Sequence, residues 1–142
     1  MKPLILAASI SIVLAGVAGE AAAACVAGGG VTAVTGTANL TTLLSEKTVC
    51  VKDSTGSGWE WQEEHRGGPT TGELWDYKLG KDPIDPTEKV GSWTVSRSGV
   101  NHNYGSGGTY NYTVFNNGNR TYSFCAGRRD IVATIKDGRG PC

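Results

Sequence analysis

From Thr48 onward, the chain repeats short runs in which apolar and polar residues alternate with a period of two. Val49 and Val51 alternate with polar neighbours, as do Trp93 and Val95. Such alternation is typical of antiparallel strands with one face on a core and the other in water. Further runs lie at residues 74–78, 110–114, 121–125 and 131–136, and no stretch shows a convincing helical period of 3.6.

Clusters of Gly, Asn, Asp, Ser and Pro separate these runs. Asn117-Gly118, within FNNGNR, predicts a hairpin, because both positions of its turn tolerate positive φ. Strands joined by such short turns predict an all-β, antiparallel, up-and-down meander. Closure would remove the exposed sheet edges, so we expect a barrel of about seven to eight strands. A two-sheet β-sandwich is the alternative.

Two segments stand outside the meander. Ala38–Lys47 predicts a short helical turn that plugs one end of the barrel, with Leu40, Leu43 and Leu44 as its apolar stripe. Lys81–Lys89 contains two prolines and predicts a stiff loop rather than a strand. The acidic residues of that loop match no EF-hand spacing, which favours a solvated loop over a calcium site.

The beginning of the chain has the pattern of a secretory leader. Residues 1–24 open with one Lys, continue with an apolar run and close on small residues, which predicts a signal peptide. Residues 25–142 then form a single secreted or periplasmic β domain without a membrane span, and the Ala-rich leader suggests a bacterial source. Lipid anchoring through Cys25 is the alternative, although Ala22 stands where that signal usually has Leu.

The four cysteines, an even number in an exported chain, predict two disulfides. Cys50 and Cys125 alternate with apolar neighbours and should therefore project outward from the sheet. Cys25 and Cys142 lie on the terminal tails. Four cysteines allow three pairings, of which locality favours Cys25–Cys50 and Cys125–Cys142, with both tails strapped to the outside of the sheet.

The stretch GSGWEWQEEHRGG, residues 56–68, is the richest in functional side chains. As a strand it places Trp59, Trp61, Glu63 and His65 on one face. The opposite face is wholly polar, so the tryptophan face should be the inner one. Glu60, Glu64 and Arg66 are then expected in solvent.

The other histidine of the chain receives the same interpretation. His102 shares a face with Val100 and Tyr104, so it should also point inward. Buried ionisable groups are costly unless paired, which places them at a barrel mouth, against one another or against a ligand. The candidate ligand-binding residues are Trp59, Trp61, Glu63, His65, Trp75, Tyr77, His102, Tyr110 and Tyr112.

Several functional classes lack support in the sequence. Formal net charge is zero and no long basic run occurs, which argues against nucleic acid as a partner. No nucleophile motif is present, so no catalytic residue is assigned. A metal site would need Glu63, His65 and His102 to converge, and without a His-x-His or His/Cys motif no metal or cofactor is predicted.

The expected architecture is similar in general shape to the meander barrels of lipocalins and avidins. The lipocalin Gly-x-Trp lies in the first strand, whereas Gly91-Ser92-Trp93 lies mid-chain here, so no family is assigned. The first functional hypothesis is a binding protein for a small apolar or aromatic ligand. The alternative is an interaction module with a solid core, such as an inhibitor, adhesin or surface-assembly subunit that binds an extracellular protein. A weaker alternative is an enzyme with a His/Glu acid-base pair.

Overall fold

A computed structural model describes residues 22–77 and 87–142 of the chain. Strands dominate, with one short α-helix and one turn of 3-10 helix. The elements are β1 (Thr32–Val34), α1 (Thr37–Leu44), β2 (Lys47–Lys52), β3 (Trp59–Arg66), β4 (Thr71–Asp76), β5 (Glu88–Val95), β6 (Val100–Asn103), η1 (Gly105–Gly107), β7 (Thr109–Gly118), β8 (Thr121–Cys125) and β9 (Ile131–Asp137).

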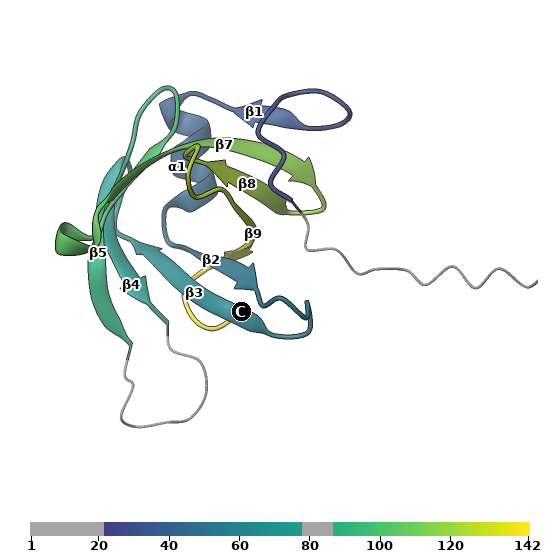
Figure 1. The fold of residues 1–142 in the computed structure, drawn as a ribbon. Coiled ribbons are helices and arrows are strands. Elements are labelled where there is room, and N and C mark those ends of the chain that lie inside the picture. Colours follow the sequence, from purple (N-terminus) through teal and green to yellow (C-terminus); the bar gives the residue numbers. More distant parts are fainter. Residues whose placement is uncertain (1–21, 78–86) are drawn as a thin grey trace, which may run out of the picture.

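The strands form a closed barrel (Figure 1). Each strand from β2 to β9 pairs antiparallel with the next, and β9 returns to pair with β2, which closes eight strands into one sheet. β1 lies outside the barrel and pairs with β7. The predicted up-and-down meander barrel is therefore confirmed, and the sandwich is excluded.

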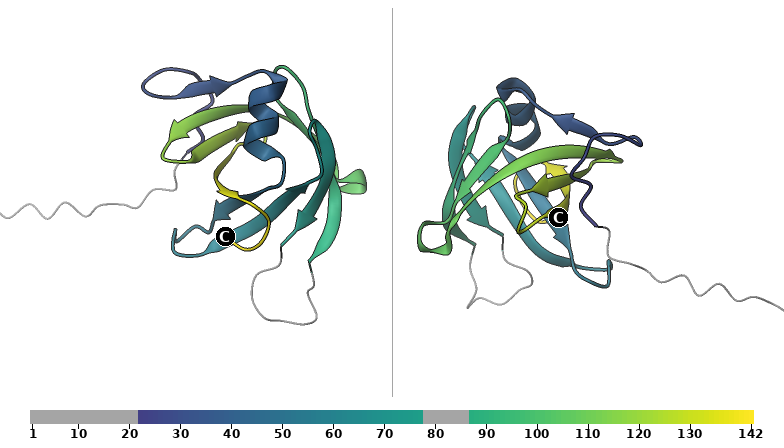
Figure 2. Two further views of the ribbon diagram at one scale, coloured as in Figure 1. Left: turned by 180° about the vertical axis from the view of Figure 1, so that it is seen from behind. Right: turned by 45° about the horizontal axis from the view of Figure 1, so that its top comes forward.

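The helix α1 covers one end of the barrel, as the view from behind shows (Figure 2). Its side chains Leu40 and Leu44 are fully buried and join the barrel core. The predicted plug is thus confirmed, although the helix ends at Leu44 and Lys47 already belongs to β2. Among the described residues no helix has the length and apolarity to cross a membrane.

The two ends of the barrel differ. Successive strands run in opposite directions, so the turns 67–70, 96–99 and 119–120 share the end covered by α1. The connections 53–58, 104–108 and 126–130 lie at the other end, which we call the open end. Residues 81–86 of the predicted stiff loop lie outside the described residues, as do residues 1–21 of the predicted leader, and Glu88 and Lys89 belong to β5.

The β7–β8 hairpin is confirmed, but its turn lies two residues later than Asn117-Gly118. Gly118 pairs with Thr121, which leaves Asn119 and Arg120 as the turn. Both have positive φ, 50° and 60°. A register shift between Asn116 and Gly118 displaces the turn from the predicted dipeptide, since the extra residue is absorbed within the strand.

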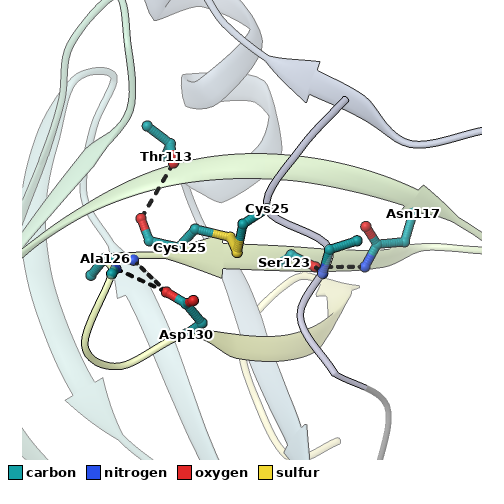
Figure 3. The surroundings of a disulfide bond; sticks show 9 residues. Cys25, Thr113, Asn117, Ser123, Cys125, Ala126 and Asp130 are labelled. Atoms are coloured by element: carbon teal, nitrogen blue, oxygen red, sulfur yellow. Dashed lines mark hydrogen bonds between the residues drawn. A yellow bond between two sulfur atoms is a disulfide. The ribbon is translucent and has the colours of Figure 1, made fainter. Parts of the chain in front are cut away.

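The two disulfides are present, but the predicted local pairing is wrong. The bonds join Cys25 to Cys125 and Cys50 to Cys142. The backbone amide of Ala24 donates to Ser123 Oγ at 2.9 Å, which lays the N-terminal segment along β8 and brings Cys25 to Cys125 (Figure 3). Each bond still ties a terminal segment to a barrel strand, as expected. The bonded cysteines are far apart in sequence because closure of the barrel brings the ends of the chain to strands distant in sequence.

The C-terminal segment covers part of the outer face of β3. The amide of Gly140 donates to Glu64 at 2.7 Å, and the amide of Cys142 donates to Gln62. The Glu64 side chain is 2% exposed and its carboxylate pairs with Arg66. The prediction that Glu64 lies in solvent is therefore wrong, whereas Glu60 on the same strand is exposed.

Candidate functional site

The candidate site lies inside the barrel, where β3 and β6 face each other. Alternation along β3 directs Glu63 and His65 inward, and His65 pairs in register with the fully buried Leu74. On β6, His102 lies between Trp93 and Tyr110 of the neighbouring strands. The two histidines, 37 residues apart in sequence, meet with their Nε2 atoms 3.0 Å apart.

A carboxyl group and a phenol continue this network toward the open end. The Tyr104 hydroxyl donates to the Glu63 carboxyl group, with O···O distances of 2.9 and 3.1 Å. It also lies 3.3 Å from His102 Nδ1, which in turn is 3.7 Å from a Glu63 oxygen. Tyr104 was absent from the predicted ligand-binding residues, although its position two residues after His102 on the same face was a usable signal.

Burial controls the protonation of this network. Desolvation raises the pKa of Glu63 to about 8, with the Tyr104 hydrogen bond opposing the rise and the charge of Asp76 adding to it. Desolvation lowers the pKa of His102 to about 4. Desolvation, together with the charge of the neighbouring His102, holds the pKa of His65 well below its usual value. Near neutral pH both imidazoles are therefore uncharged, and Glu63 is largely protonated.

Hydrogen bonds do not account for every nitrogen of the histidine pair. A neutral imidazole has one N–H group and one lone pair, so one ring donates to the other between the Nε2 atoms. His65 Nδ1 is buried and has no hydrogen-bond partner within the described residues. Buried polar atoms usually have a partner, and the backbone of Glu63 is the candidate here, since it opposes the fall in the His65 pKa.

A pocket of about 260 Å³ opens directly above the network. Glu63 and His102 form its floor, and Tyr110 and Tyr112 stack along one wall with ring centroids 6.1 Å apart. Arg129 lies at the rim, where its guanidinium is 5.8 Å from the Tyr110 ring centroid. The other lining residues are Trp61, Tyr104, Gly107 and Ile131. The lining residues Tyr104, Gly107, Arg129 and Ile131 were not among the predicted ligand-binding residues.

Below the network the barrel interior is filled. Trp93, Phe124 and Leu74 are fully buried, as are the two α1 leucines that close that end. His65 lies at the boundary between the two halves, because it contacts His102 but does not line the pocket. The interior is thus a solid core at one end and an aromatic cup at the other.

Six of the nine predicted ligand-binding residues meet in this region, namely Trp61, Glu63, His65, His102, Tyr110 and Tyr112. The inward orientation predicted for Trp59 and Trp75 is wrong. A register shift between Val51 and Lys52 turns the Trp59 side chain to the other face of the strand. There it lies beside the Cys50–Cys142 disulfide, with the Lys52 ammonium over its ring.

Trp75 lies on the outer face of the barrel. It pairs in register with Glu64, and its ring lies 4.0 Å from the Arg66 guanidinium. The inner position of β4 belongs to Leu74 instead. Tyr77 follows the last residue of β4 and is not among the residues that line the pocket. Aromatic type alone did not distinguish the two faces of this strand, because a cation on the outer face also binds a tryptophan ring.

Comparison of the chain with models of protein families, with curated proteins and with solved structures finds no match. The site must therefore be interpreted from its own geometry. It combines an aromatic cup with a floor of hydrogen-bonding groups that stay uncharged near neutral pH. Such a combination is compatible with a binding role.

Proposed function

We propose that this chain is a secreted or periplasmic binding protein that takes a small aromatic or apolar ligand in the open-end pocket. One observation carries the proposal: two buried ionisable side chains, Glu63 and His102, form the floor of a pocket that reaches solvent. A solid core would fill these positions with aliphatic residues, because burying an ionisable group is costly. Retaining both groups beneath an aromatic cup favours a role in orienting a ligand.

The dimensions of the pocket limit the ligand. A cavity of about 150 Å³ holds one benzene molecule. The pocket, at about 260 Å³, therefore suits a compact molecule of one or two rings. The stacked Tyr110 and Tyr112 would contact its apolar body, and the floor would hydrogen-bond a polar substituent. Arg129 at the rim would favour ligands with an acidic group at the opposite end.

Export is part of the same proposal. Two disulfides suit an oxidising compartment, and residues 1–24 have the composition of a secretory leader. Both cysteine pairs would otherwise face a reducing environment. Sequencing the N-terminus of the protein recovered from the culture medium or periplasm tests this, and a chain that retains residues 1–24 would contradict it.

A ligand screen tests the binding proposal. We expect one-ring and two-ring aromatic acids and phenols from a small panel to raise the melting temperature and to quench the fluorescence of Trp61, which lines the pocket. Replacement of Tyr110 by Ala removes one wall and should weaken the best hit by about tenfold. Tyr122→Ala is the matched control, because Tyr122 lies near α1, away from the pocket.

Two outcomes would contradict the proposal. One is the absence of any hit across the panel, and the other is a hit whose affinity is the same in Tyr110→Ala and in the Tyr122→Ala control. Either result would favour the interaction-module hypothesis instead. In that case the outer surface, rather than the interior, would be the place to search for a partner.

A further inference from the structure

The two histidines of the chain, which belong to different strands, present their Nε2 atoms to each other at 3.0 Å. Two imidazole nitrogens about 2.1 Å from one metal ion lie about 3.0 Å apart when the bonds meet at a right angle, and about 3.4 Å apart in a tetrahedral site. The observed separation therefore fits two adjacent positions that meet at a right angle around a metal, besides fitting a hydrogen bond.

A third ligand is available beside the pair. One donor atom from each of Glu63, His65 and His102 lies within 4.8 Å of the other two. Two imidazoles and one carboxylate are a ligand set used by zinc enzymes and by non-haem iron sites. Asp76 of β4 pairs in register with Glu63, and its charge adds to the rise in the Glu63 pKa.

The surroundings resemble the outer shell of a metal site. Metal-bound histidines usually direct their other ring nitrogen at a hydrogen-bond acceptor. His102 Nδ1 faces the Tyr104 hydroxyl at 3.3 Å. Hydrogen bonding within the protein leaves His65 incompletely satisfied in the described part of the chain. The backbone of Glu63 is the candidate acceptor for His65 Nδ1.

The pocket also gives access to two of these three side chains. Glu63 and His102 line the floor of the open-end pocket, so an ion held by them would face a cup that reaches solvent. Three protein ligands with a free position toward a pocket are characteristic of reactive metal sites, whereas structural zinc sites are closed. We propose that Glu63, His65 and His102 bind one divalent transition-metal ion, of the zinc and iron class, at the base of this pocket.

Metal titration of the disulfide-bonded protein, after removal of metals with EDTA, tests the proposal without any organic ligand. Calorimetry with Zn²⁺ should give one ion per chain. Co²⁺ should give a visible d–d absorption band that Zn²⁺ abolishes. Glu63→Gln and His102→Ala should each weaken binding by at least about tenfold. Glu60→Gln is the matched control, since Glu60 is exposed on the opposite face of the same strand, and it should bind as the wild type does.

The wild-type protein supplies a second test in case a histidine variant fails to fold. With two histidines in the chain, the imidazole ¹⁵N signals in NMR belong to His65 and His102, and both rings should shift on addition of Zn²⁺. No heat, no band and no imidazole shift at up to about 1 mM metal would overturn the proposal. Binding that is unchanged in Glu63→Gln would overturn it too. Neither failure would affect binding of an organic ligand, which is measured separately.

Discussion

The imidazole rings of His65 and His102 meet almost head to head inside the barrel, with their Nε2 atoms 3.0 Å apart and their ring centroids 4.9 Å apart. One ring comes from β3 and the other from β6, so this contact joins two strands that are not neighbours in the sheet. The pair separates the filled half of the interior from the aromatic cup. Its energetics therefore bear on both the stability of the fold and the chemistry of the site.

The histidine pair should be energetically coupled. His65→Leu alone or His102→Leu alone leaves one buried imidazole nitrogen without its partner, which costs about 1 to 3 kcal/mol. The double variant removes both polar groups, so its loss of unfolding free energy should be smaller than the sum of the single losses. Urea denaturation of all four proteins in EDTA measures the coupling. Strict additivity would show that the rings do not interact.

The stability of the metal-free protein should peak near pH 6.5. The pKa of His102 is 6.5 in the unfolded chain and about 4 in the folded protein, and folding also lowers the pKa of His65. Both histidines therefore bind protons more readily in the unfolded chain, so the unfolding free energy falls as pH drops below about 6.5. Folding raises the pKa of Glu63 from 4.5 to about 8, so its contribution to the unfolding free energy declines as pH rises from 4.5 toward 8. Between pH 4.5 and 6.5, the unfolding free energy gained from the two histidines as pH rises exceeds the free energy lost through the single carboxyl group.

Denaturation at a series of pH values in EDTA measures this profile. Glu63→Gln cannot ionise, so it should lose the decline between about pH 6.5 and 8. Glu60→Gln, with its side chain in solvent, should retain the decline. A wild-type profile that stays flat from pH 6.5 to 8 would mean that Glu63 ionises without cost, which would contradict its deep burial.

The β7–β8 turn should tolerate Gly but not a β-branched residue at Asn119. That position has a φ of 50°, a left-handed conformation that costs L-residues about 1 to 2 kcal/mol and costs β-branched residues most. Asn119→Val should therefore lower the unfolding free energy by about that amount, while Asn119→Gly should leave it unchanged or slightly improved. Equal stability of the two variants in thermal denaturation would place the turn elsewhere.

Glu64 should contribute to stability despite its position on the outer face. It accepts a hydrogen bond from Gly140 and pairs with Arg66 at 2.6 Å while 2% exposed. Glu64→Ala should cost about 1 to 3 kcal/mol, because the Gly140 amide loses its acceptor and Arg66 its partner. The exposed Glu60→Ala should change stability by less than about 0.5 kcal/mol. Similar losses for both variants in urea would show that the C-terminal segment does not cover Glu64.

Each disulfide should stabilise the barrel independently. Replacement of Cys25 and Cys125 by Ser, or of Cys50 and Cys142 by Ser, should cost about 2 to 5 kcal/mol, since each bond closes a long loop of the unfolded chain. Denaturation without reductant measures the loss. Peptide mapping under non-reducing conditions checks the pairing itself, and a peptide that links Cys25 to Cys50 would contradict it.

Period-two alternation was sufficient to predict the barrel and the core of the site. It placed Glu63, His65 and His102 inward from two short stretches of sequence, and all three residues are buried. It failed at Trp59, where a register shift between Val51 and Lys52 moves the side chain to the other face. A bulge of this kind adds one residue to one strand and has no reliable signature in a single sequence.

Long-range effects account for the remaining errors. Glu64 follows the expected alternation to the outer face, but the C-terminal segment covers it, and no local pattern indicates where a tail will lie. The disulfide pairing failed for the same reason, because locality along the chain does not measure distance in a closed barrel. Contact between the two histidines was one of three arrangements expected from the sequence, and the choice among them depends on the register of β3 through β6.

The two disulfides also impose an order on the biosynthesis of the chain. Each joins one of the first two cysteines to one of the last two, with sequence separations of 100 and 92 residues. Neither native bond can therefore close until the ribosome has produced nearly the whole domain. Cys25 and Cys50 precede the other two cysteines, so a bond formed between them before then would have to be exchanged later. Exchange of such a bond is the reaction that a thiol–disulfide isomerase catalyses, whereas formation of the native bonds needs an oxidant.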